Sequence, residues 1–387
     1  MSIPFKLISL IQKMYAHAKF YVEIDGISSA TYTQETGIRQ GCPLSPYLFL
    51  IVMTIIFHDI QEKMPQQIIK DRVINANFDQ VLFADDTICI SENAESLTKR
   101  LHLIQEEGGK YGLQLNLDKC ELIRISRTTS FTEKDNVFFK HGQKVNIKDE
   151  AKYLGCWLNY KGDPTREVRQ RITVCMTILK KLDLYWFKAN PSIKEKLQVY
   201  DAIIKSKLLY GLESAPMNES TKHELDIFQL KGLRKILGIK TTFVDKTQDN
   251  KTIYRKVQQH IHENTKSGKP ERQIKPMSQV YEERKTQLLN SIICSPEGSP
   301  TRVLTFQPNT LQPTEIHDNN TRKRRSGHPR VKWVDTTLEN LWTLIKMEMP
   351  QFRYSPLNLS NPQHIEAIKL AAGTNLHEIT PGYIIRD

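Results

Sequence analysis

The stretch VLFADDTICI, residues 81–90, places two adjacent carboxylates between two short apolar runs. β-Branched and aromatic residues on both sides of a polar break favour two short strands joined by a turn. Such a hairpin anchors its strands in the core and leaves Asp85 and Asp86 at its exposed tip. Carboxylate oxygens suit Mg²⁺, and two-metal sites hold their ions about 3.5–4 Å apart to bind an attacking and a leaving oxygen. Paired aspartates are also ordinary turn residues, so the surrounding sequence must decide between a metal site and a structural turn.

The stretch GIRQGCPLSP, residues 37–46, precedes this hairpin and combines two glycines with two prolines. It predicts a loop in which glycine lets the backbone approach a ligand, while the amide of Gln40 offers hydrogen bonds to a base or sugar. Ser45 is expected to cap the following helix, with Pro46 at its first position. Residues 48–60 are apolar nearly all round, which predicts a helix packed on most sides. A rigid loop that enters a buried helix is the simpler interpretation.

Residues 1–160 mix helical and strand patterns and predict an α+β fold, an antiparallel sheet with packed helices. An amphipathic helix at the start is followed by a hairpin that turns at Asp25-Gly26. Further strands are expected at residues 113–117, 121–125, 145–147 and 153–158.

The chain changes character after this part. Residues 161–240 carry apolar side chains at four-three spacing and a capping box from Ser192 to Glu195, which predict a helical region. Residues 241–321 are polar and predict a flexible or loosely folded connector. A small basic C-terminal region follows at residues 322–387.

The charge of the chain is strongly asymmetric. The 387 residues carry a formal net charge of +12, with a sequence pI of about 9.2. Residues 1–160 hold 18 basic and 19 acidic side chains, whereas residues 161–387 hold 37 and 24. A near-neutral part followed by a basic one suits a chemical module joined to a module that binds nucleic acid. Weak attraction to anionic membranes is the alternative.

The cysteines and the apolar segments predict an intracellular protein, in the nucleus or the cytoplasm. The six cysteines stand far apart without a C-x-x-C pair, which predicts reduced thiols and neither a disulfide framework nor a zinc ribbon. The opening residues lack the pattern of a signal peptide, so secretion is not expected. Residues 48–60 are shorter than the roughly 20 residues that span a bilayer, so they are interpreted as a buried helix. The predicted partners do not include a membrane.

Two of these motifs together resemble a known family. Phe83-Ala84-Asp85-Asp86 resembles the aromatic-x-Asp-Asp box of reverse transcriptases, and residues 37–46 are similar to that family's G-[VI]-R-Q-G-[CD]-P-L-S-P element. The resemblance implies a polymerase palm in which Asp85 and Asp86 are catalytic and bind Mg²⁺ or Mn²⁺. It also implies contacts to substrate or nucleic acid from four loop residues: Arg39, Gln40, Gly41 and Pro43.

The resemblance continues downstream. Residues 115–121, LNLDKCE, are similar to an [LIV]-N-x-x-K-[TC]-E segment, which implies that Lys119 lies near the triphosphate as charge neutraliser or proton donor. Tyr153-Leu154-Gly155 resembles the [YF]-L-G hairpin that holds the primer end against the palm. A surface lysine and a core tyrosine are the simpler interpretations.

Beyond residue 160 the resemblance is to the thumb and C-terminal regions of non-LTR, LINE-type retrotransposon polymerases. The strings EVRQRI (167–172), LYGLE (209–213) and LRKILGI (233–239) carry the first match, and RRSGHPRVKWVD (324–335) carries the second. Arg166 and Arg169 are candidate contacts to a template–primer backbone, or else form a solvated helix face. Arg324 and Arg325 belong to a basic run that predicts phosphate binding or nuclear import.

One expected residue is missing. A reverse transcriptase palm needs a third carboxylate from an A-F-D-like strand before the loop of residues 37–46, and nothing upstream of Gly37 matches it. Glu23 and Asp25 fall in the hairpin that the family places after that strand. The sequence is therefore interpreted as a C-terminal fragment of a polymerase, which predicts no processive synthesis by the chain alone.

Two classes of function remain open at this point. The first is an RNA-directed DNA polymerase that uses an RNA template, a DNA primer and dNTPs. The alternative is a non-catalytic remnant that binds RNA or DNA through its basic helices. An intron maturase shares the palm, but no basic splicing domain is evident. The sequence assigns no protein partner.

Overall fold

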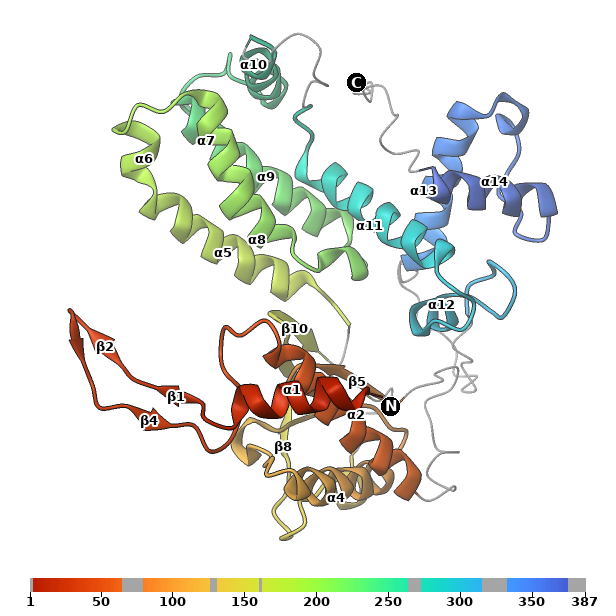
Figure 1. Cartoon of the computed structure of the whole chain (residues 1–387). Coiled ribbons are helices and arrows are strands. Elements are labelled where there is room, and N and C mark those ends of the chain that lie inside the picture. The colour runs from red at the N-terminus through yellow and green to blue at the C-terminus, as the bar shows by residue number, and fades with distance from the viewer. Residues whose placement is uncertain are drawn as a thin grey trace. The chain divides into compact units, whose positions relative to one another are not determined.

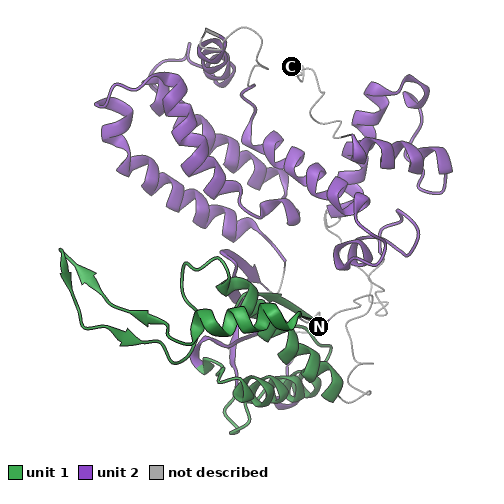
Figure 2. Cartoon of the chain, in the orientation of Figure 1, with its two compact units in different colours: residues 1–71, 80–117, 135–144 green, residues 72–79, 118–134, 145–387 purple. Residues whose placement is uncertain are grey.

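The computed structural model describes residues 3–64, 79–125, 131–159, 162–263, 273–314 and 333–374 (Figure 1). The chain divides into two compact units (Figure 2). The first comprises residues 1–71, 80–117 and 135–144, and the second comprises residues 72–79, 118–134 and 145–387. The sequence predicts a boundary near residue 160, whereas the structure groups the strands after residue 145 with the C-terminal helices.

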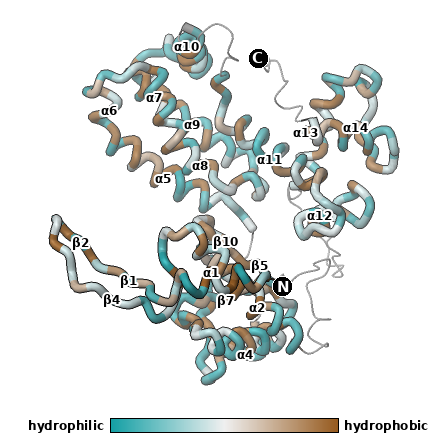
Figure 3. Tube along the Cα trace, in the orientation of Figure 1, coloured by the Kyte–Doolittle hydropathy of each residue, from teal (hydrophilic) through white to brown (hydrophobic). Residues whose placement is uncertain are grey.

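The first unit begins with helix α1 (Phe5–Tyr15) and a narrow β-ribbon. The ribbon contains two antiparallel pairs: β1 (Lys19–Phe20) with β4 (Tyr32–Thr33), and β2 (Glu23–Ile24) with β3 (Ile27–Ser28). Asp25 and Gly26 have φ angles of 51° and 78°, which confirms the predicted turn. All residues of these strands are exposed although many are apolar, as the brown segment at β2 in Figure 3 shows.

The core of the first unit lies between helices α2 (Ser45–Lys63) and α4 (Ala94–Lys110). Its buried residues come from one face of α2 and the residue that follows it: Met53, Ile56, Phe57, Ile60 and Met64. Leu50 on the same helix is 51% exposed, so the prediction of packing on most sides is wrong for the described residues. The predicted cap is also displaced by one residue, because Leu44 is the N-cap and the Ser45 hydroxyl lies 3.2 Å from that of Tyr15.

The α+β prediction is confirmed, with five two-stranded sheets among the described residues. Besides the ribbon pairs they are β5 (Gln80–Phe83) with β6 (Asp86–Cys89), β7 (Glu121–Ile123) with β8 (Asn146–Lys148), and β9 (Glu150–Tyr153) with β10 (Cys156–Asn159). The β7–β8 pair is parallel, which its long connection permits. The strand expected at residues 113–117 is absent, since its last residue begins the 3₁₀ turn η1 (Leu117–Lys119).

Helices form most of the second unit, as predicted for residues 161–240. In order they are α5 (Thr165–Lys181), α6 (Asp183–Phe187), α7 (Ile193–Val199), the π-helix η3 (Tyr200–Lys205), α8 (Ser206–Leu209), the 3₁₀ turn η4 (Leu212–Ser214) and α9 (Glu219–Leu237). The capping box of Ser192 and Glu195 forms as expected. The predicted apolar stripe is buried at Val168, Cys175 and Leu179, inside a large helical core.

The prediction of a flexible connector over residues 241–321 is wrong in its described parts. Three helices lie there: α10 (Asn250–Glu263), α11 (Met277–Cys294) and α12 (Pro300–Thr305). Ile253 and Val257 are fully buried in the helical core, one turn apart on α10. Helix α10 has one apolar face in an otherwise polar stretch, so the average composition conceals it.

The C-terminal region shares helix α11 with the rest of the second unit. Leu289 and Ile293 of α11 join a second cluster with α13 (Trp333–Glu348) and α14 (Pro362–Gly373), next to the 3₁₀ turn η5 (Pro350–Phe352). His364 stacks on Trp342 at a ring separation of 4.4 Å. Among the described helices, none combines the length and apolar character needed to cross a bilayer.

We predict that Gly232→Ala destabilises the second unit by about 1–3 kcal/mol. A Cβ atom on this residue of α9 would lie 2.5 Å from the ring of Tyr200, which is itself fully buried. Urea unfolding followed by tryptophan fluorescence measures the effect, because all four tryptophans lie in this unit. Gly373→Ala in α14 of the same unit is the control, since its Cβ would meet no atom within 4 Å. Equal stability of wild type and Gly232→Ala would contradict the packing.

We also predict that Glu107→Gln reduces the stability of the first unit at neutral pH but not in acid. Glu107 on α4 is only 1% exposed, and hydrogen bonds from Lys110 and then Lys63 lower the pKa of its carboxyl. A lowered pKa in the folded state stabilises the fold above the unfolded value of about 4.3, and this contribution disappears as pH falls through the folded value.

Hydrogen exchange of the α2 and α4 amides measures this contribution at several pH values. The difference between wild type and Glu107→Gln should shrink as pH falls below about 4. The control is Glu95→Gln, because Glu95 forms an exposed pair with Lys99 and should have little effect. A difference that is constant with pH would contradict the assignment.

Candidate active site

The β5–β6 hairpin joins its strands through a two-residue turn. Phe83 pairs with Asp86, so Ala84 and Asp85 alone form the turn. Ala84 has a φ of 52°, in the left-handed region that a tight turn requires and that alanine adopts at some cost. The predicted hairpin is therefore present, with Asp85 in the turn and Asp86 as the first residue of the second strand. The predicted anchoring of its first strand in the core is wrong, because residues 81–83 are exposed.

This register determines where the two carboxylates lie. Directly paired residues project from the same face of a two-stranded sheet, so Asp86 shares a face with Phe83, which is 60% exposed. Both aspartates are exposed, and within the described part of the chain neither forms an ion pair. Two adjacent charges of the same sign repel each other unless a cation lies between or beside them. The tip is thus accessible and electrostatically suited to a cation.

The donor set of this tip fits Mg²⁺ or Mn²⁺, which prefer carboxylate oxygens. In the described residues, no third histidine, cysteine or acidic side chain groups with Asp85 and Asp86. Mg²⁺ takes six ligands and usually keeps several waters or substrate phosphate oxygens. Asp85 and Asp86 could therefore hold an ion only if water, substrate or another carboxylate supplied most of its ligands.

The loop of residues 37–46 has the open backbone that its glycines predict. Gly37 and Gly41 have φ angles of 81° and 85°, and a Cβ atom at either position would meet nothing within 4 Å. Arg39 lies over the ring of Tyr15 at 5.6 Å and donates to the carbonyl of Met14. Gln40, Gly41 and Pro43 are exposed. One face of the loop is therefore free to approach a ligand.

Cys42 lies in this loop at the start of α2. Hydrogen bonds from the backbone of Leu44 and Ser45, and from the Ser45 side chain, lower the pKa of its thiol, with a smaller contribution from Arg39. The region around the thiol is therefore favourable to negative charge, as expected at a helix N-terminus.

The other predicted site residues belong to the second unit. Lys119 ends the 3₁₀ turn η1 and is exposed. The β9–β10 hairpin pairs Tyr153 with Cys156, so Leu154 and Gly155 form its turn with φ angles of 47° and 84°. The loop of residues 37–46 and the Asp85 hairpin share the first unit. The grouping of Lys119 and Tyr153 with Asp85 stays a prediction.

Residues 1–158 match the family model described as reverse transcriptase (RNA-dependent DNA polymerase). This segment belongs to the reverse transcriptase family. It contains both motifs that led to this prediction, the loop of residues 37–46 and the Asp85-Asp86 hairpin, and the β9–β10 turn. The predicted family is confirmed for this segment.

Relatives of the reverse transcriptase segment come from retrotransposable elements. The chain is 28% identical over 158 residues to a retrovirus-related Pol polyprotein from the type-2 retrotransposable element R2DM of Drosophila melanogaster. It is 25% identical over 167 residues to a Pol polyprotein from the type-1 retrotransposable element R2 of Nasonia vitripennis. These matches cover 39% and 41% of this chain but only 14% and 16% of the polyproteins. They support the predicted relation to non-LTR retrotransposons.

Arg166 and Arg169 of α5, the two predicted contacts to a nucleic-acid backbone, each pair with a carboxylate of the protein. Arg166 lies 2.7 Å from Glu150, and Arg169 makes a bidentate contact with Glu224 of α9. Hydrogen bonding to Glu224 raises the pKa of Arg169 further. Each carboxylate therefore competes with a phosphate for its arginine. The other two predicted contacts, Arg324 and Arg325, lie outside the described residues.

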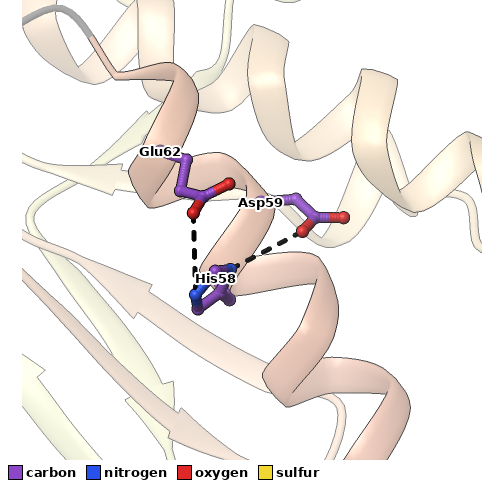
Figure 4. Close-up of side chains that lie close together, drawn as sticks. All are labelled: His58, Asp59 and Glu62. Carbon is purple, nitrogen blue, oxygen red and sulfur yellow. Dashed lines mark ion pairs between the residues drawn. The ribbon is translucent and has the colours of Figure 1, made fainter.

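One group of potential metal ligands was not predicted from the sequence. His58, Asp59 and Glu62 lie together on the surface of α2 (Figure 4). Nδ1 of His58 is 3.7 Å from Asp59, and Nε2 is 3.8 Å from Glu62. One ion can bind only one nitrogen of an imidazole, so the two carboxylates face different donors. We interpret the group as a surface feature of the helix.

The sequence reasoning also missed a buried ion pair. Glu167 and Arg171 of α5 are paired with each other and almost fully buried. Their i,i+4 spacing was visible in the sequence, but the same spacing usually marks a solvated helix face. Only the fold shows that strand β10 covers this face, through the backbone N–H of Trp157 that donates to Glu167.

We predict that Glu224→Gln steepens the salt dependence of RNA binding. The substitution releases Arg169 to contact phosphate, which adds about one unit to the slope of log K against log salt concentration. Filter binding of a short RNA at several salt concentrations measures the slope. Adding Arg169→Gln should restore the wild-type slope.

Glu219→Gln is the control, because Lys222 keeps its pair with Glu282. An unchanged slope in Glu224→Gln would show that Arg169 does not reach RNA.

Proposed function

We propose that this chain carries part of the active site of an RNA-directed DNA polymerase of a non-LTR retrotransposon. The observation that carries the proposal is the pair of exposed carboxylates, without ion-pair partners in the described residues, at a two-residue hairpin turn inside the reverse transcriptase segment. The reaction is attack of a primer 3′-hydroxyl on the α-phosphate of a dNTP, with release of pyrophosphate. RNA template, DNA primer and dNTP are the corresponding partners.

The residues take distinct roles in this proposal. Asp85 and Asp86 hold Mg²⁺ or Mn²⁺, which when bound would stabilise the attacking and leaving oxygens. The open backbone at Gly37 and Gly41 accommodates the nucleotide, and the Gln40 amide orients its base or sugar. Lys119 neutralises charge on the triphosphate or protonates the leaving group. The turn that follows Tyr153 supports the end of the primer.

We further propose that the chain by itself performs no processive synthesis. Two neighbouring carboxylates supply few of the ligands that two ions need, and the described residues bring no third ligand to them. A carboxylate from elsewhere is therefore required for turnover. The cysteines are all free thiols, which supports the proposed place inside the cell, in nucleus or cytoplasm.

Nucleotide-dependent binding of a template–primer tests this function without requiring turnover. We predict that Mn²⁺ with the complementary dNTP tightens binding of an RNA–DNA duplex with a recessed 3′ end about tenfold, and that Asp85→Asn abolishes this gain. Fluorescence anisotropy of a labelled primer measures both. Glu62→Gln is the control, as an exposed carboxylate of the same unit. Primer extension in the same mixtures should yield no processive product.

The alternative is a non-catalytic nucleic-acid-binding remnant. The excess of basic residues after position 160 favours it. In that case the duplex binds with strong salt dependence, but neither dNTP nor Asp85→Asn changes its affinity. This outcome would contradict the polymerase proposal.

A further inference from the structure

The β9–β10 hairpin is anchored to the helices of the second unit by one buried ion pair. Glu167 and Arg171 lie one turn apart on α5, and each is less than 10% exposed. One carboxylate oxygen of Glu167 accepts from Nε of Arg171, and the other accepts from the backbone N–H of Trp157 at 3.3 Å. Glu167 therefore contacts the backbone of strand β10, only two residues beyond the turn at Gly155.

The remaining nitrogens of Arg171 bind two further segments. Nη1 donates to the carbonyl of Tyr210 and, at 3.4 Å, to that of Leu208. Nη2 lies 3.2 Å from Sγ of Cys156, the residue that directly follows the turn. The planar guanidinium thus joins strand β10, helix α5 and the segment after α8. A lysine has no fork with which to reach all of these acceptors.

The contact between the hairpin and the segment after α8 is also too close for larger side chains. Gly211 has a φ of 66°, and a Cβ atom there would lie 2.9 Å from Sγ of Cys156. On the other side, a Cβ atom at Gly155 would lie 3.6 Å from the Tyr210 ring. The hairpin turn and Tyr210-Gly211 are therefore packed directly against each other.

A buried ion pair often has only a structural role, and replacing it with apolar residues can be neutral. Here both members bind groups next to the turn at Leu154-Gly155: a strand N–H, a thiol and the carbonyl of Tyr210. The pair therefore fixes the turn relative to α5 and α8. The position of the turn would change if Glu167 or Arg171 lost these hydrogen bonds.

We propose that Glu167 and Arg171 are positioning residues that set the Tyr153-Leu154-Gly155 turn at the place where it supports the primer 3′ end. This inference rests on the proposed polymerase function. It predicts that a change in the pair alters the environment of the terminal primer base, while the rest of the template–primer interface still binds.

A primer with 2-aminopurine at its 3′ terminus tests the inference. The fluorescence of this base reports its stacking at the primer end, and anisotropy of a distal label reports overall affinity. Wild type should change the 2-aminopurine signal on binding. Glu167→Gln, Arg171→Lys and Tyr153→Ala should each abolish that change, with overall affinity within about threefold of wild type.

The control is Arg302→Lys. Arg302 is also a buried arginine of the second unit. It donates to the carbonyl of Ile293 and to the carboxylate of Glu297. It contacts no residue of the hairpin, so the signal should remain.

Gly211→Ala supplies an independent disturbance should Arg171→Lys fail to fold. It should also abolish the signal, because the added methyl group would strike Sγ of Cys156.

The outcomes separate the two proposals. In one outcome, Tyr153→Ala abolishes the signal, but Glu167→Gln, Arg171→Lys and Gly211→Ala all retain it. This result would overturn the positioning role and leave the polymerase proposal intact. A wild type that fails to bind the template–primer would overturn both. Loss of the signal in the pair variants, with affinity kept, supports the positioning role.

Discussion

The two-residue turn between β5 and β6 is the constraint on which the candidate site depends. Because Phe83 pairs with Asp86, only Ala84 and Asp85 remain for the turn, and Ala84 must adopt a left-handed conformation. A shift of one residue in this register would move the Asp86 side chain to the opposite face of the hairpin. The turn thus leaves both aspartates exposed at the end of the hairpin, where a cation can reach them.

A second tight turn, at Leu154-Gly155, is held in place by a buried ion pair. The acidic hairpin belongs to the first unit, whereas this hairpin belongs to the second and is held to its helices by Glu167 and Arg171. Polymerase chemistry needs the metal ligands and the primer end at a defined separation. In the proposed function, metal binding therefore falls to the first unit and primer support to the second.

Local features of the fold could be predicted from the sequence. The turns at Asp25-Gly26 and Ala84-Asp85 follow from residue types within a few positions, as does the capping box at Ser192. Features that depend on distant residues could not be predicted. Arg169 is paired with a glutamate 55 positions away, and α10 becomes recognisable only when Ile253 and Val257 are seen in the core. The loop and the acidic hairpin were therefore predictable, whereas the pairing of the arginines was not.

Paramagnetic broadening by Mn²⁺ tests the central claim most directly. In an amide NMR spectrum of the chain with a labelled first unit, we predict that low Mn²⁺ concentrations broaden the resonances of residues 84–87 first. Asp85→Asn should abolish this effect, and excess Mg²⁺ should reverse it. Broadening that begins instead around His58, Asp59 and Glu62, or that is unchanged by Asp85→Asn, would contradict a metal site at the hairpin tip.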